Sequence, residues 1–149
     1  MLSGEGITDI KYMGKNIISV FPKERLLYDV KSAKGAPQKS AFVTEAVATY
    51  TDADGNTAVI SDGIDGFDKT SLTVYTGKNQ VKYKTELEGK PGAVVLKGNK
   101  SYVSCGNKVY EVSKGKLRDS AVLDFSPDGL VISEGKIFAY SSGFLKQVI

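Results

Sequence analysis

The stretch that decides the fold runs from Pro91 to Lys116 and reads PGAVVLKGNKSYVSCGNKVYEVSKGK. Three short runs rich in β-branched and aromatic residues are separated by two Gly-Asn pairs and one Lys-Gly pair. Such pairs accept the positive φ angles of tight hairpins, and runs of this length and composition are typical of strands. The stretch therefore predicts a meander of short antiparallel strands.

Similar phrases recur along the whole chain, which indicates a repeat protein. Each phrase has the order strand, glycine turn, strand, turn and a strand with Tyr or Phe, often followed by a fourth strand. We expect a single all-β domain of four units, at about residues 7–38, 39–90, 91–120 and 121–149. A chain of 149 residues is long enough for one such domain with its own core.

Two strand assignments set the boundaries of these units. The segment Lys39–Tyr50 is predicted as the strand that opens the second unit, because it gathers Thr, Val and Tyr residues. Its apolar positions would also suit one face of a short helix, which is the alternative. Ala121–Phe125 is predicted as the strand that opens the fourth unit.

The motifs of the third unit resemble those of a known family of repeats. Its Pro-Gly-aliphatic entry (Pro91–Val95) is followed by a Tyr-Val strand (Tyr102–Ser104) and an Asn-x-Val strand (Asn107–Val112). This order resembles the blades of β-propellers of the NHL and YVTN types, and Phe125–Gly129 is similar to the turn of WD-type blades. The resemblance implies antiparallel four-stranded blades around an axis, used mainly as rigid binding platforms.

The number of units favours a small or incomplete propeller. Four blades is the lowest number in the usual range. The chain starts almost at a first strand and ends at a last one, so we expect no additional strand to close a ring. An open arc would expose two apolar flanks for a partner or a second copy to cover. We therefore expect a homo-oligomer, or a place in a larger assembly such as a virion or phage tail.

Charge and hydropathy exclude several classes of partner. The chain has 20 Lys and Arg residues and 17 Asp and Glu residues. Its basic residues are scattered and form no basic stripe, which argues against nucleic acid as a partner. No apolar run is long enough to cross a bilayer, and the N-terminus lacks the basic start and apolar stretch of a secretory signal. These features predict a cytoplasmic or virion protein without a membrane partner.

The residues needed for most catalytic sites are missing. The chain has no histidine and one cysteine, Cys105, so Ser-His-Asp triads, Cys-His pairs and histidine metal sites are excluded. We predict no catalytic residue, no metal site and no cofactor. A hydrolase would require two carboxylates in one pocket, with Asp124 and Glu134 or Asp62 and Asp68 as the available pairs.

The acidic loop at Asp52–Asn56 has alternating oxygen ligands that are typical of calcium sites. Thr57 and Gly63 stand where an EF-hand needs its glycine and its glutamate. The loop is therefore interpreted as a hairpin turn.

The most unusual segment lies between two predicted strands and reads DGIDGFDK from Asp62 to Lys69. Three carboxylates, an aromatic ring and a lysine on a glycine-hinged loop are typical of a contact loop, and the alternative is simply a long hairpin. The residues predicted to contact a partner are Asp62, Asp65, Phe67, Asp68 and Lys69. The predicted function is a non-catalytic structural or protein-interaction module. A platform for carbohydrate or another small ligand is the alternative.

Overall fold

The computed structural model describes residues 8–32, 35–63 and 68–148 of the chain. Its strands form four antiparallel sheets, of which three have four strands and the last has three. Within each sheet every strand pairs with the next one along the chain, so each sheet is a meander. The predicted all-β architecture of meander repeats is confirmed.

The first two sheets occupy the N-terminal half of the chain. The first contains β1 (Asp9–Tyr12), β2 (Asn16–Val20), β3 (Glu24–Asp29) and β4 (Gln38–Ala41). The second contains β5 (Ala48–Thr51), β6 (Thr57–Asp62), β7 (Lys69–Tyr75) and β8 (Val81–Glu88).

The last two sheets occupy the C-terminal half. The third contains β9 (Pro91–Lys97), β10 (Lys100–Cys105), β11 (Lys108–Ser113) and β12 (Lys116–Val122). The fourth contains β13 (Gly129–Ser133), β14 (Lys136–Ser141) and β15 (Phe144–Gln147).

Helix is almost absent from the described residues of the whole chain. The described residues contain one helical element, the 3-10 turn η1 (Val30–Ser32) that precedes β4. None of these residues belongs to a helix long and apolar enough to cross a membrane.

Two predicted strands are placed differently by the structure. Lys39–Tyr50 is divided, because β4 pairs with β3 in the first sheet while β5 opens the second sheet. The predicted strand Ala121–Phe125 is wrong, since Ala121 and Val122 complete β12 against β11 in the third sheet. In both places the outermost strand of one sheet is followed directly by the connection to the next sheet. Hydropathy alone does not show where the strand ends and the connection begins.

The tight turns follow the chemistry expected of them. Gly98 and Gly106 have positive φ angles of 58° and 59°, each as the first residue of a two-residue hairpin loop. In the next hairpin Lys114 and Gly115 both have positive φ, the pattern of a type I′ turn. The Asp52 carboxylate accepts hydrogen bonds from the backbone N–H groups of Asp54 and Asn56, at 3.0 and 2.9 Å. This segment joins β5 to β6 as a hairpin, as predicted.

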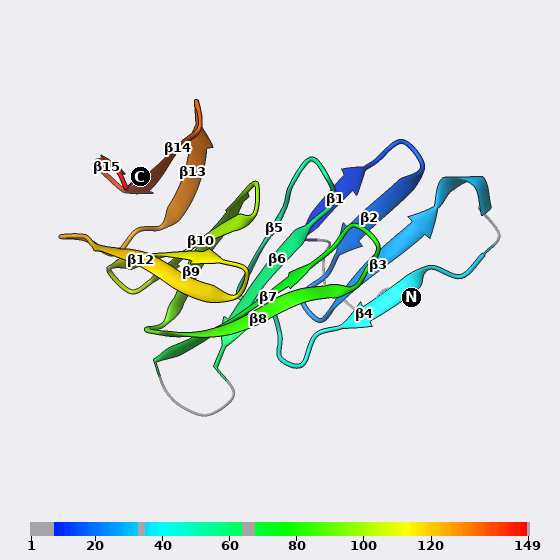
Figure 1. Ribbon diagram of the computed structural model, residues 1–149, viewed down its shortest axis with the longest axis horizontal. Coiled ribbons are helices and arrows are strands. Elements are labelled where there is room, and N and C mark those ends of the chain that lie inside the picture. Colours follow the sequence, from blue (N-terminus) through cyan, green and yellow to red (C-terminus); the bar gives the residue numbers. More distant parts are fainter. Residues whose placement is uncertain (1–7, 33–34, 64–67, 149) are drawn as a thin grey trace.

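The four sheets follow one another along an open arc. Figure 1 shows the first sheet and the fourth at opposite ends of the molecule, with the other two between them. The first strand of each sheet contacts the first strand of the next, so that β1, β5, β9 and β13 form the inner side of the arc. Among the described residues the first and fourth sheets have no comparable contact. The arrangement is that of propeller blades without a closed ring.

The core lies between facing sheets and follows the two-residue period of the strands. In β9, Val94 and Leu96 pack toward the second sheet in one cluster, whereas Val95 packs toward the fourth sheet in another. In β10, Val103 belongs to the cluster with the second sheet and Tyr102 belongs to the cluster with the fourth sheet. Because the third sheet is covered on both faces, its strands have continuous apolar runs in place of an alternating pattern.

A buried arginine joins the first sheet to the second. The Arg25 side chain is completely buried and donates hydrogen bonds to the Gly55 carbonyl at 2.8 Å, Asn79 Oδ1 at 2.8 Å and Thr57 Oγ1 at 3.1 Å. Desolvation by burial lowers the pKa of the guanidinium to about 10, and the nearby Tyr75 opposes this shift. Neutral acceptors thus take the place of water around this charge.

We expect Arg25→Ala to lower the free energy of unfolding by about 3 kcal/mol, because it leaves two buried acceptors and one partly buried acceptor without their donor. Urea titration monitored by circular dichroism measures this loss. The matched control is Lys39→Ala, which removes the exposed ion pair with Glu24 and should cost less than about 1 kcal/mol. Equal losses for the two variants would contradict this role of Arg25.

Candidate functional site

The predicted contact segment joins β6 to β7 at one end of the second sheet. Asp62 is the last residue of β6 and Lys69 is the first residue of β7. The Gly63 N–H donates to the Lys69 carbonyl at 2.8 Å and closes the base of the loop. Asp65 and Phe67 lie outside the described residues. Asp68 has a φ of 60° and returns the chain into β7.

Two other connections reach the same end of the sheets. The β8–β9 link and the β10–β11 turn meet the end of the β6–β7 loop there, as backbone hydrogen bonds from Gly89 to Asp68 and from Gly106 to Lys90 show. The three connections bring together Asp68, Lys69, Glu88, Lys90, Asn107 and Lys108, and we call this group the loop face.

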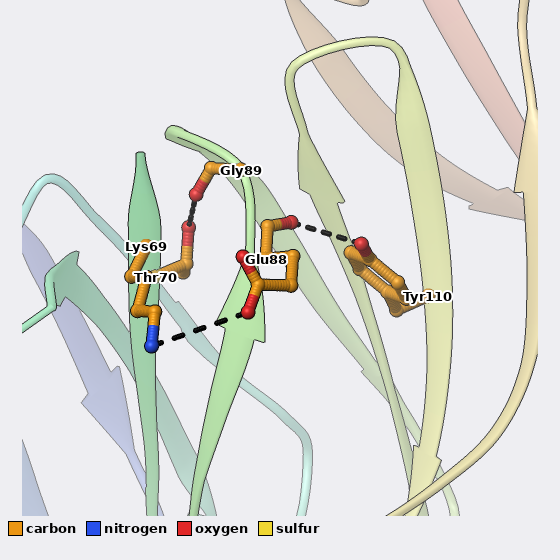
Figure 2. Close-up of polar contacts among 5 residues, drawn as sticks. All are labelled: Lys69, Thr70, Glu88, Gly89 and Tyr110. Atoms are coloured by element: carbon orange, nitrogen blue, oxygen red, sulfur yellow. Dashed lines mark hydrogen bonds and ion pairs between the residues drawn. The ribbon is translucent and has the colours of Figure 1, made fainter. Parts of the chain in front are cut away.

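The charges of the loop face are paired only loosely. Lys90 Nζ lies 4.0 Å from Asp68 Oδ1, and Lys69 Nζ lies 4.0 Å from Glu88 Oε1. Figure 2 shows the second of these pairs crossing from β7 to β8. The side chains of Lys90 and Glu88 are 81% and 78% exposed. Ion pairs of this length and exposure contribute less than about 1 kcal/mol to stability. Each of these side chains can therefore leave its present ion pair at little cost and form one with another charged group.

The backbone under these charges is held by hydrogen bonds between the three connections. The Gly89 N–H donates to the Asp68 carbonyl at 2.5 Å, and the Gly106 N–H donates to the Lys90 carbonyl at 3.1 Å. The Tyr110 hydroxyl donates to the Glu88 carbonyl at 2.9 Å and the Thr70 hydroxyl donates to the Gly89 carbonyl at 2.8 Å, as Figure 2 shows. These bonds give the exposed side chains a fixed base.

Gly89 is the residue that lets the second and third sheets approach at this point. Its φ is 109°, and a Cβ atom there would lie 2.9 Å from Cβ of Cys105. Any larger residue would therefore strain the backbone and push the two turns apart.

A hollow of about 370 Å³ opens between the three connections. Its lining combines charged residues of both signs with Gly89, Gly106 and Cys105. Asp68 belongs to this lining, whereas Asp62 lies outside it. The sequence does not identify Glu88, Lys90 and Lys108 as site residues, because the first two flank a short link between sheets and the third flanks an ordinary hairpin turn. Only the meeting of three connections makes them neighbours.

The thiol of Cys105 lies beneath the hollow. Its side chain is 2% exposed and donates to Thr70 Oγ1 at 3.3 Å. Desolvation by burial raises the pKa of this thiol, and the hydrogen bond with Thr70 opposes the shift in part. A protonated, buried thiol is a poor nucleophile, so the geometry favours a structural role.

Other arrangements that could support chemistry are not assembled in the described part of the chain. Asp124 precedes β13 and Glu134 follows it, so these two carboxylates lie at opposite ends of one strand. Within the described ranges no three Cys, Asp or Glu side chains gather in a way that could hold a metal ion.

Comparison with solved structures identifies the fold. The computationally designed Ika8 protein has a TM-score of 0.76 at 13% identity, covering 97% of this chain and 46% of its own. Hydrazine synthase of Kuenenia stuttgartiensis has a TM-score of 0.68 at 15% identity, covering 92% and 42%. BBS1N, solved in complex with ARL6DN, has a TM-score of 0.66 at 13% identity, covering 95% and 51%.

Hydrazine synthase and BBS1N are β-propeller proteins. The fold is β-propeller-like. The resemblance drawn from the Pro91–Val112 motifs is thereby confirmed at the level of the β-propeller fold. This chain spans about half the length of the three structures compared, in keeping with an arc of four sheets. No protein-family model matches the sequence, and comparison with curated proteins gives no match either.

The burial of Cys105 leads to a prediction about its reactivity. We expect iodoacetamide to alkylate this thiol on the order of 100-fold more slowly in the folded chain than in urea, because the reactive thiolate must be exposed. The unfolded thiol ionises first as the pH rises through about 8.5, so its contribution to stability falls above that pH. Mass spectrometry of quenched samples measures the alkylation rate of the folded chain and of the chain in urea, each at pH 7 and at pH 9. Equal rates in the folded and unfolded chains would contradict the burial of this thiol.

Proposed function

We propose that the protein is a non-catalytic interaction module that binds a protein partner through its loop face. We further propose that it self-associates as part of a larger assembly, such as a virion or phage tail. The observation that carries the proposal is the open hollow of about 370 Å³ surrounded by exposed charges of both signs. A protein surface with Lys or Arg beside Asp or Glu matches this pattern.

Preorganisation of the backbone supports a binding role for the loop face. Hydrogen bonds from Tyr110 and Thr70 hold the carbonyls of Glu88 and Gly89, so little backbone freedom is lost when a partner binds. The charged side chains above them supply specificity and steer association. Asp62, Asp65 and Phe67, the other predicted contact residues of the β6–β7 segment, complete the proposed contact set.

Residue chemistry favours binding over catalysis. The chain has no histidine, and its single thiol is buried and protonated. BBS1N, which has the same kind of fold, was solved in complex with a protein partner. Hydrazine synthase has this kind of fold too and is an enzyme, so the fold by itself does not decide between the two.

The size and lining of the hollows bear on the small-ligand alternative. A second hollow, between the connection that follows β4 and the face of the second sheet, measures only about 170 Å³. Pockets for small organic ligands are mostly apolar and usually occupy about 300–1,000 Å³. The hollow of the loop face reaches that size, but its charged rim is better suited to the charged side chains of a protein.

Charge reversal on the loop face tests the proposal. We expect Lys90→Glu to weaken binding of the partner about tenfold, equivalent to about 1.4 kcal/mol, because it turns an exposed cation of the hollow into a like charge beside Asp68. The partner is first identified by cross-linking in native extract, and its affinity is then measured by calorimetry.

Lys78→Glu is the matched control, because Lys78 is an exposed lysine in the β7–β8 turn at the opposite end of the sheets. It should leave the affinity unchanged. Equal affinities for the wild-type chain and both variants would overturn the proposed role of the loop face. Saturable binding on a glycan array without any protein partner would favour the carbohydrate alternative.

A further inference from the structure

The outward face of the first sheet carries apolar side chains that none of the other described sheets covers. The register aligns Ile10 with Ser19 and Leu26, and it aligns Tyr12 with Ile17 and Tyr28. The neighbouring residues Ile18, Val20 and Leu27 point the other way and form a buried cluster with Phe42. Alternation along each strand therefore places Ile10, Tyr12, Ile17, Leu26 and Tyr28 on the face that no other sheet of the described residues covers, and we call this set the first flank.

Three of the five residues of the first flank are exposed, and Ile17 and Leu26 are partly buried. Ile10 is 62% exposed, Tyr12 is 66% exposed and Tyr28 is 37% exposed. The Ser19 hydroxyl alternates with Ile18 and Val20, so it lies on the same side as the first flank. It is buried beneath its neighbours on this face, and no described residue forms a hydrogen bond with it.

The outward face of the fourth sheet has the same character at the other end of the arc. The register aligns Val131 with Phe138 and Tyr140 with Leu145. We call these four residues the last flank. Leu130, Ile137 and Ala139 point the opposite way and are buried against the third sheet. Val131, Tyr140 and Leu145 are 42%, 44% and 69% exposed.

The two flanks have the composition of the contacts that already join the sheets. Where the third and fourth sheets meet, Val95, Tyr102 and Val109 pack against Leu130 and Ile137. Aliphatic side chains with a tyrosine thus form an interior junction, and both flanks offer the same combination. The flanks lie at opposite ends of one arc (Figure 1), so a single copy does not bring them together.

We propose that two copies of this chain close a ring of eight sheets, in which the last flank of each copy packs on the first flank of the other. The inference rests on the self-association in the proposed function and names its partner, its stoichiometry and its surface. A two-fold axis along the centre of the ring relates the copies, so that both junctions form together and no apolar flank remains open. Two copies also supply the length that one copy lacks, since this chain spans 46% of Ika8 and 51% of BBS1N.

The mass of the purified 149-residue chain in solution tests the ring. Light scattering after size-exclusion chromatography should give twice the 16.0 kDa of one chain. Tyr12→Lys on the first flank and Leu145→Glu on the last flank should each give 16.0 kDa, because every junction contains both flanks. Both side chains are mostly exposed, so circular dichroism should show an unchanged fold.

Mixing the two variants distinguishes the ring from other dimers. One junction of the mixed pair is unaltered and the other combines a lysine-bearing flank with a glutamate-bearing flank, so the dimer should return. Leu117→Lys, at an exposed apolar position on the edge of the third sheet, is the control and should leave the mass at twice that of one chain.

Three results would overturn the proposal. A wild-type mass of 16.0 kDa would mean that something other than a second copy covers the flanks. Loss of the dimer in only one of the two variants would mean that a flank packs on itself. A dimer that survives both substitutions would place the interface elsewhere. Binding of a partner by the loop face is measured separately with Lys90→Glu, so failure of the ring leaves that part of the proposed function standing.

Discussion

Face-to-face packing of adjacent sheets is the constraint on which the rest of this structure depends. A four-stranded meander has two faces, and each is stable only when apolar side chains on it are covered. The second and third sheets satisfy this condition through one shared cluster that includes Leu72, Val74, Val94 and Val103. The first and fourth sheets are covered on one face each, which leaves Tyr12 at one end of the arc and Leu145 at the other exposed.

The same packing positions the loop face. Stacked meanders place alternate connections at one end, so three turns that are separate in the sequence become neighbours around one hollow. Gly89 permits that approach because it has no Cβ atom to meet Cys105. Hydrogen bonds between the turns then fix the backbone, while the charges of Lys90 and Glu88 stay exposed. The stacking of the sheets is therefore sufficient to give the loop face a rigid backbone with exposed charged side chains.

Most of the fold could be predicted from local sequence, because hairpins are local structures. The Gly-Asn pairs at 98–99 and 106–107 identify the turns of the third sheet, and the strands between them lie where expected. The outermost strands were harder to place, as the wrong assignment of Ala121–Phe125 illustrates. An outer strand such as β12 is exposed along most of its length, so its composition resembles that of a loop. Its membership depends on hydrogen bonds to β11, which the sequence does not encode in any period.

The sequence by itself determined the strands, the turn types and the absence of histidine chemistry, since these follow from side-chain type and short-range backbone preference. Only the tertiary structure decided which carboxylates and lysines meet. It grouped Asp68 with Glu88 and Lys90, and it separated Asp124 from Glu134. It also showed that the first and fourth described sheets do not pack on each other as neighbouring sheets do. The physical reason is that the sequence of an apolar sheet face is the same whether or not another sheet covers it. Only the positions of the four sheets show which apolar faces have a neighbouring sheet.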